Sequence, residues 1–259
     1  MIYFIIGSSV VLLILLLLFL YLENNWLDID YYEYKTKVKK AIRICQISDL
    51  HSKKFGNNNQ KLINEIGKIN PNIIVYTGDM VHSKKDDFNI SLSLMKSLSK
   101  YKSFYVTGNH EERMPKSIKE DYLKKIKECG VIILNNEDYR YEDILIRGIS
   151  NASKPQDLDD YFKMEKSSVN LSILLAHQPE LFKYYNEDIV FSGHAHGGQF
   201  RFFGKGLYAP QQGLFPKYTS GAYFDDGKIM YVSRGLGGKD FPFRIFNRPH
   251  IIVLDILPK

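Results

Sequence analysis

The sequence has few cysteines, and its first 22 residues carry no charged side chain. Two cysteines, Cys45 and Cys129, are too few for a disulfide framework or for a zinc site made of thiolates. Hydrophobic residues make up 44% of the 259 residues and charged residues 25%, which excludes a disordered or low-complexity chain. The net charge of +6 comes from scattered lysines, so we expect no specific binding to nucleic acid. The length suits one sizeable domain.

The uncharged N-terminus is a continuous apolar run, since all 35 basic and 29 acidic residues lie beyond it. As a helix, residues 2–22 would be about 31 Å long, enough to cross a bilayer core of roughly 30 Å. A cleaved signal peptide is the alternative, but the run has no basic residues before it, is too long, and is not followed by a small-x-small cleavage site. We therefore expect residues 1–22 to be a single-pass transmembrane anchor, with Tyr21 and Trp26 at the membrane interface.

The charges after the anchor leave its orientation open. A group of basic residues favours a cytoplasmic location for the rest of the chain. Acidic residues precede this group, however, and long domains can be translocated regardless of charge. The basic residues are Lys35, Lys37, Lys39, Lys40 and Arg43.

Residues 23–40 are expected to be a polar connector, in which Tyr31, Tyr32 and Tyr34 pack onto the domain or the membrane interface. From residue 41 to 259, short apolar runs alternate with segments of helical period, which predicts a single α/β domain. The expected strands are 42–47, 73–77, 104–107, 131–134, 144–149, 171–176, 189–192, 230–233 and 251–256. The expected helices are 60–69, 90–100, 117–129, 158–164 and 179–185.

Short polar segments rich in histidine follow five of these strands, at residues 48–51, 78–80, 108–111, 176–177 and 193–198. Strand ends of this kind meet at the carboxyl edge of an α/β sheet, where binding sites usually lie. A lone aspartate there is commonly a helix cap, and a lone histidine is more often structural than a ligand. Together, however, the segments supply nitrogen and oxygen donors without cysteine, which suits Mn²⁺, Fe²⁺, Zn²⁺ or Co²⁺.

The spacing within two segments favours shared ligation. In Asp49-x-His51 and His194-x-His196, residues two apart on extended backbone would point to the same side. Neighbouring glycines such as Gly78 would let the backbone turn sharply beside a metal or phosphate. The donors exceed what one four-coordinate ion needs, so two divalent metals sharing a carboxylate would use them better.

Read in order, Asp-x-His, Gly-Asp, Gly-Asn-His-Glu, an isolated histidine and Gly-His-x-His resemble the calcineurin-like metallophosphoesterase superfamily over residues 45–198. Segments 193–201, 215–223 and 233–237 resemble its membrane-associated or exported bacterial phosphodiesterases. The resemblance implies a four-layer α/β/β/α sandwich, with residues 41–259 as the catalytic domain.

The resemblance also implies a role for each matching residue. Asp49, His51 and His196 would hold one metal, Asn109, His177 and His194 the second, and Asp79 would bridge them. A hydroxide between the metals would attack phosphorus in line, and His110 would act as the catalytic acid rather than as a ligand.

Several nearby residues have two interpretations. Glu111 either orients His110 or is a solvated turn residue. Phosphate contact and ordinary surface charge are both open for Gln199, Arg201 and Arg234.

Four further positions complete the pattern. Ala195 stands where this branch usually has threonine, and His250 where it has an acidic residue. We interpret His82 as a loop histidine, with substrate contact as the alternative, and Cys45 as core packing.

We therefore expect a membrane-bound, dinuclear phosphoesterase acting on phosphodiester or pyrophosphate bonds, with a lipid-linked substrate made plausible by the anchor. A phosphomonoesterase or protein phosphatase on the same fold is the main alternative. A non-catalytic scaffold should lack several of the ligands or His110, which this chain has. A hydrolase of amides or lactones would fit the Gly-Asn-His-Glu segment poorly.

Overall fold

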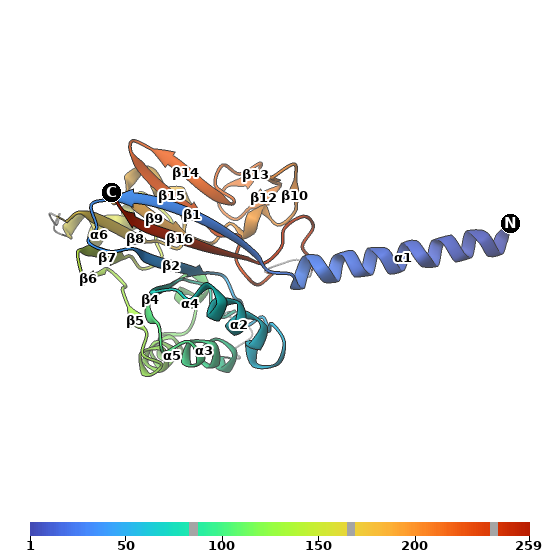
Figure 1. The fold of residues 1–259 in the computed structure, drawn as a ribbon, viewed down its shortest axis with the longest axis horizontal. Coiled ribbons are helices and arrows are strands. Elements are labelled where there is room, and N and C mark those ends of the chain that lie inside the picture. The colour runs from blue at the N-terminus through green and yellow to red at the C-terminus, as the bar shows by residue number, and fades with distance from the viewer. Residues whose placement is uncertain (83–87, 165–168, 239–242) are drawn as a thin grey trace.

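The computed structural model describes residues 1–82, 88–164, 169–238 and 243–259. Its first element is a 24-residue helix, α1 (Ile2–Asn25), which projects from the domain as a rod (Figure 1). This helix is long and apolar enough to cross a membrane, and its apolar side chains are exposed.

The first of two six-stranded sheets contains both ends of the domain. Its order is β1 (Asp28–Thr36), β16 (His250–Pro258), β2 (Ile42–Ile47), β3 (Ile73–Thr77), β4 (Lys102–Val106) and β5 (Ile132–Ile133). Neighbouring strands run parallel except β16 and β2, which are antiparallel. The parallel strands β2, β3 and β4 therefore bring their carboxyl ends to one edge.

The second sheet has a parallel centre with antiparallel edges. Its order is β14 (Gly221–Asp225), β15 (Lys228–Val232), β9 (Ile189–Ser192), β8 (Leu171–Leu175), β7 (Ile144–Gly148) and β6 (Glu137–Tyr141). Strands β7, β8, β9 and β15 are parallel, and the edge strands β6 and β14 are antiparallel to their neighbours.

The two sheets pack against each other through one face of each. Val75 of β3 and Phe191 of β9 belong to the buried cluster between the sheets. Since successive side chains of a strand point to opposite faces, Tyr76 and Val190 lie on the outer faces. These faces are covered by helices, which confirms the expected four-layer α/β/β/α sandwich.

Three helices cover the first sheet: α2 (Gln60–Ile69), α3 (Phe88–Ser97) and α5 (Lys116–Glu128). The second sheet carries the shorter α6 (Asp159–Lys163) and the 3-10 helices η2 (Pro155–Leu158) and η3 (Pro179–Tyr184). Leu62, Ile66 and Ile69 recur at helical spacing in α2 and are buried on the sheet. Full burial of such a side chain contributes about 1.5–3 kcal/mol.

The segment expected as a connector contains a strand of the first sheet. Residues 28–36 form β1, which pairs along its whole length with β16. Tyr32 and Tyr34 pack on the cluster between the sheets, and the Tyr32 ring lies 4.8 Å from that of Tyr231. The acidic residues made the segment look polar, but Asp28 and Asp30 pair with Arg234 and His250, and Glu33 is exposed, as suits an edge strand. The structure thus extends the domain toward the N-terminus.

Short elements surround the carboxyl edges of the sheets. They are η1 (Asn57–Asn59), α4 (Asn109–Glu112), η4 (His196–Gly198) and two hairpins, β10 (Arg201–Phe202) with β11 (Lys205–Gly206) and β12 (Tyr208–Ala209) with β13 (Gly213–Leu214). The sequence patterns did not predict these hairpins, β6 or β14. The helix expected over 179–185 is present as the 3-10 helix η3.

Candidate metal centre

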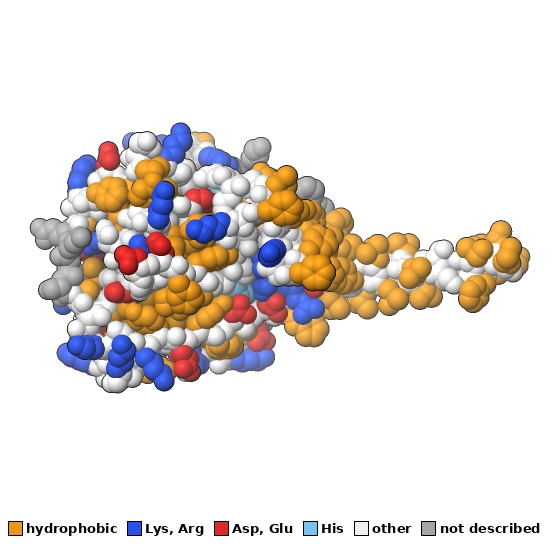
Figure 2. Space-filling view, turned by 90° about the horizontal axis from the view of Figure 1, so that it is seen from above, with side chains coloured by type: hydrophobic (Ala, Val, Ile, Leu, Met, Phe, Trp, Pro, Cys, Tyr) orange, Lys and Arg blue, Asp and Glu red, His pale blue; other side chains and the backbone are white. Residues whose placement is uncertain are grey.

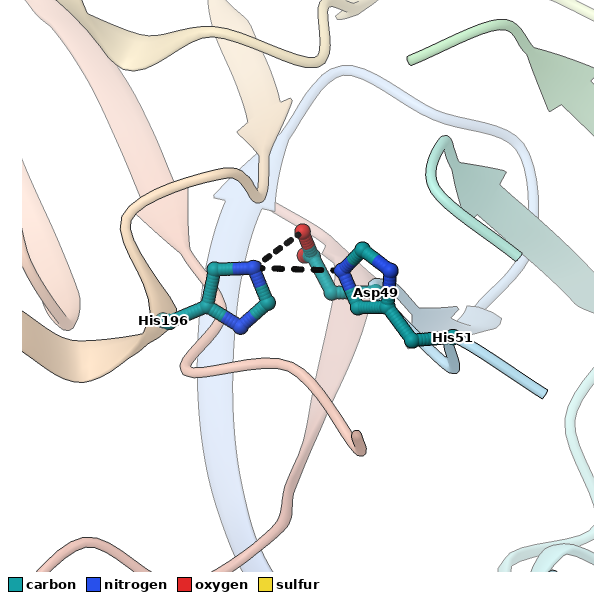
Figure 3. Close-up of side chains that lie close together, drawn as sticks. All are labelled: Asp49, His51 and His196. Atoms are coloured by element: carbon teal, nitrogen blue, oxygen red, sulfur yellow. Dashed lines mark hydrogen bonds and ion pairs between the residues drawn. The ribbon is translucent and has the colours of Figure 1, made fainter. Parts of the chain in front are cut away.

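The expected ligands come together at the carboxyl edges of both sheets, and all of them are buried. One group consists of Asp49 and His51, which follow β2, and His196, which follows β9 (Figure 3). The Nε2 atoms of His51 and His196 lie 3.2 Å apart, and His196 Nε2 lies 3.5 Å from Asp49 Oδ1. Two nitrogens bound at about 2.1 Å to one tetrahedral ion would be about 3.4 Å apart, so this spacing suits a shared metal.

A second group lies beside the first. His177 Nε2 is 3.3 Å from Asp79 Oδ2, 3.2 Å from His194 Nδ1 and 3.3 Å from Asn109 Oδ1. His177 Nδ1 also lies 2.7 Å from the Thr77 carbonyl, which orients the ring so that Nε2 faces the other donors. These four side chains therefore offer a second set of nitrogen and oxygen ligands.

Asp79 stands between the two groups. Its Oδ2 atom lies 3.3 Å from His177 Nε2 on one side and 3.8 Å from His51 Nε2 on the other. His110 Nε2 is 4.0 Å from the same oxygen, so His110 also joins a group of possible ligands with His51 and Asp79. A single carboxylate oxygen thus faces both candidate metal positions.

The backbone brings these side chains together by left-handed turns. Positive φ angles occur at Asp49 (50°), His51 (46°), Asp79 (52°), His194 (68°) and His196 (47°). The extended backbone proposed for the two ligand pairs is therefore wrong, although each pair does share a cavity. Left-handed conformations are uncommon outside glycine and concentrate at functional sites.

Neighbouring atoms lie so close to the backbone of the site that glycine is required there. A Cβ atom on Gly78, whose φ is 87°, would lie 2.7 Å from His177 Nδ1 and 2.6 Å from the Gly108 nitrogen. No side chain fits there without displacing a ligand.

Family comparison agrees with this geometry. A family model described as calcineurin-like phosphoesterase matches residues 42–198, well over half of the chain. The chain belongs to the calcineurin-like phosphoesterase family. It is accordingly a metal-dependent phosphoester hydrolase, and the expected family is confirmed.

Two curated relatives of this phosphoesterase span most of its sequence. The metallophosphoesterase Cj0846 of Campylobacter jejuni is 30% identical over 236 residues, which cover 86% of this chain and 61% of that protein. The UDP-2,3-diacylglucosamine pyrophosphatase LpxG of Chlamydia muridarum is 24% identical, with 92% of this chain and 91% of that protein covered. A solved crystal structure with 10% identity and a TM-score of 0.50 covers 74% of this chain and 90% of its own, and shows likeness of fold alone.

Glu111 of the phosphoesterase is buried and is therefore not a solvated turn residue. Its buried carboxylate accepts backbone N–H bonds from Asp79 (2.9 Å), Met80 (2.8 Å) and Gly108 (2.8 Å). Glu111 therefore ties the loop after β3, which carries Asp79, to the loop after β4, which carries Asn109.

Burial and neighbouring charges shift the pKa values of the site. Burial raises the pKa of Asp49 to about 6, and burial together with the Asp79 charge raises the pKa of Glu111 to about 7. Burial lowers the pKa of His177, but the Asp79 carboxylate more than offsets this and raises it to about 10. Burial alone would raise the pKa of Asp79, yet His177, His51 and His110 hold it well below its usual range. Three buried carboxyl groups close together suit a cationic occupant.

His110 and His82 both lie beside His51 of the first group. The His110 backbone nitrogen donates to Asp79 Oδ1 at 2.8 Å, and its ring is 4.7 Å from that of His51. The half-buried His82 ring is 4.7 Å from the His110 ring. His82 is thus a loop residue, but one that adjoins the site.

The structure explains the other residues singled out in the sequence. Arg201 donates to the Gly197 carbonyl at 2.8 Å, and Arg234 pairs with Asp28 at 2.8 Å, so both are engaged in protein contacts. Gln199 is buried within the loop after η4.

The remaining singled-out positions are structural. Ala195 and Cys45 are core residues, as was expected for Cys45. The buried ring of His250 lies 3.0 Å from Asp30 of β1, which accounts for a histidine at this position.

Sequence reasoning missed Asn247. Its side-chain amide donates to the carbonyls of His196 and Gln199, both at 2.8 Å. Its backbone nitrogen donates to the buried Glu23 of α1 at 2.9 Å. A single asparagine far along the chain from its partners offers no spacing signal.

Proposed function

We propose that this chain is a membrane-anchored, dinuclear phosphoesterase that cleaves phosphodiester or pyrophosphate bonds. The observation that carries the proposal is the position of Asp79 Oδ2 between two sets of nitrogen donors. One ion would be held by Asp49, His51 and His196, and the other by Asn109, His177 and His194, with Asp79 as the shared ligand. Bound divalent ions would supply Lewis acidity toward the phosphoryl group and a more nucleophilic water.

The protein's own residues supply position and a proton. Glu111 holds the loops of Asp79 and Asn109 at a fixed separation, so the two ligand sets keep their spacing. His110 lies beside the shared carboxylate: its backbone nitrogen donates to Asp79 Oδ1 at 2.8 Å, and its ring Nε2 lies 4.0 Å from Asp79 Oδ2. We assign His110 as the group that donates a proton or hydrogen bond to the leaving oxygen.

Residues 1–22 are proposed as the anchor, and the domain that performs hydrolysis as the chain from β1 onward. The relative LpxG is named for cleaving the pyrophosphate of a diacylated sugar nucleotide. That activity combines a pyrophosphate bond with acyl chains, which favours a lipid-linked substrate for an anchored relative. Identity of only 24% leaves the particular lipid outside the proposal.

The proposal is tested by hydrolysis with the full chain in detergent, loaded in turn with Mn²⁺, Fe²⁺, Zn²⁺ and Co²⁺. The substrates are bis-p-nitrophenyl phosphate, p-nitrophenyl phosphate and a lipid pyrophosphate, and an Asp49→Asn variant controls for contaminating activity. We expect faster turnover of the diester or pyrophosphate. Faster turnover of the monoester would favour the phosphomonoesterase alternative, and no turnover by any metal form would support a scaffold.

A further inference from the structure

An exposed aromatic surface lies where α1 meets the domain. It is formed by four phenylalanines, which we call the aromatic platform: Phe202, Phe203, Phe215 and Phe246. Their exposed fractions are 51%, 104%, 76% and 59%. Figure 2 shows hydrophobic side chains gathered at the base of the α1 rod. Exposed aromatic residues in one patch mark an interaction surface more often than scattered ones do.

The platform is continuous with the anchor. The Phe246 ring lies 5.4 Å from the ring of Phe19 in α1, and 6.2 Å from the ring of Phe202. Phe19 precedes the end of the apolar run at Leu22 by three residues, or roughly 4.5 Å along the helix axis. If residues 2–22 cross the bilayer, Phe246 must therefore lie at the depth of the last turn of the span.

Three of the four phenylalanines are held in left-handed backbone conformations. The φ angles are 48° at Phe203, 52° at Phe215 and 51° at Phe246. Phe203 and Gly204 (φ 77°) form the two-residue turn between β10 and β11, a turn type that favours asparagine, aspartate or glycine at both positions. A bulky residue there is strained, so its full exposure calls for an occupant outside the domain.

Basic residues accompany the platform. Lys205, Lys217 and Phe215 line a surface cavity of about 240 Å³ together with Thr219. Lysines beside interfacial aromatic residues suit the phosphate groups of lipids. This charge favours a bilayer over a second apolar protein surface.

The segments that carry the platform also hold the metal-ligand loop. Asn247, next to Phe246, donates to the carbonyl of His196, and Arg201, next to Phe202, donates to the carbonyl of Gly197. The position of the platform relative to the bilayer therefore sets the distance of the metal centre from the membrane.

We infer that the aromatic platform inserts into the headgroup region of the bilayer beside α1 and seats the metal centre at the membrane surface. The bound partner is the lipid bilayer itself. The inference rests on the proposed anchoring of α1 but not on the proposed hydrolysis. It assigns to the segments between β9 and β14 and between β15 and β16 a role in membrane contact that is separate from metal binding.

The test is depth-dependent quenching of tryptophan fluorescence in the full chain reconstituted into phosphatidylcholine vesicles. The natural tryptophan is removed by Trp26→Phe, and a new one is introduced by Phe203→Trp or, independently, by Phe215→Trp. The control is Phe162→Trp, because Phe162 is also exposed (54%) and lies in α6, at the end of the domain opposite α1 (Figure 1). Each variant is measured in vesicles whose lipids are brominated near the top of the acyl chains.

We expect bromination to remove about half of the emission in the Phe203→Trp and Phe215→Trp variants, because interfacial apolar groups reach roughly 5–10 Å into the headgroup boundary. The Phe162→Trp emission should not change. A chain that floats with the vesicles but shows no quenching at either platform position would overturn the inference while leaving the anchor intact. A blue-shifted but unquenched emission would mean that the tryptophan is buried away from lipid, and would assign the platform to contact with a second copy of the chain. A chain that does not float would overturn both the anchor and the platform, and neither result depends on hydrolysis.

Discussion

Glu111 is not one of the proposed ligands, so replacing it by glutamine should test the positioning of the ligand loops without removing a ligand. The carboxylate accepts three backbone N–H bonds at 2.8–2.9 Å. A glutamine oxygen can still accept the bonds from Asp79 and Gly108, but its amide group then faces the Met80 N–H. Loss of one hydrogen bond to a charged group costs about 1.5–3 kcal/mol. For a domain of this size, about 2 kcal/mol lowers the melting temperature by about 4–8 °C.

The assay is thermal unfolding of the metal-loaded full chain, followed by kcat on a soluble diester. Because misplacement of reacting groups by about 1 Å can cost on the order of a hundredfold, we expect kcat of Glu111→Gln to fall by more than about tenfold. The matched control is Glu112→Gln, since Glu112 is partly exposed and pairs with Lys119 at 2.8 Å. An exposed pair of this kind contributes about 0–1 kcal/mol. Equal melting temperatures and equal kcat for the two variants would refute the positioning role of Glu111.

Three further predictions concern protons and the domain boundary. With the metal removed by a chelator, the melting temperature should fall as the pH is raised from about 5 to about 9. The folded chain holds protons on Glu111 (pKa about 7) and His177 (pKa about 10) at pH values where the unfolded chain has lost them, so raising the pH favours unfolding. A melting temperature that rises with pH over this range would contradict the prediction. His110→Ala should keep its metal content and lose about 10²–10⁴-fold in kcat, with a smaller loss for a nitrophenolate leaving group; an equal loss on good and poor leaving groups would remove the acid role. A chain that begins at Asp30 should melt several degrees below one that begins at Tyr21, since it lacks Glu23 and Asp28, which bond to Asn247 and Arg234; equal melting would show that these contacts do not stabilise the domain.

The sequence predicted the parts of the fold whose signal is local. Strands β2, β3 and β9 and helix α2 have the expected bounds, because each is a short apolar run or an amphipathic segment with clear ends. Strand β1 was missed because its stability comes from pairing with β16, more than 200 residues away in the chain. Two of its acidic residues share a face with Tyr32 and Tyr34, so no clean alternation of polar and apolar residues marks the segment as a strand.

In the site, too, some features could be predicted from the sequence and others depend on contacts between distant segments. The position of Asp79 and the histidines after strands predicted that they would meet, since parallel strands place their ends at one edge. The left-handed backbone at Asp49 and His194 has no signal in residue spacing. The contacts of Glu111 and Asn247 depend on loops from separate strands, so only the folded chain identifies them as positioning residues.

Metal content tests the central claim most directly, because the account depends on one carboxylate shared between two ions. The full-length chain and its Asp79→Asn variant are loaded with the metal that supports hydrolysis, and bound ions per chain are counted by elemental analysis. We expect two ions in the wild-type chain and a loss of both stoichiometry and activity in the variant, because Asp79 Oδ2 faces both ligand sets. Two ions still bound to the folded Asp79→Asn variant, or one ion in the fully active wild-type chain, would contradict the shared site.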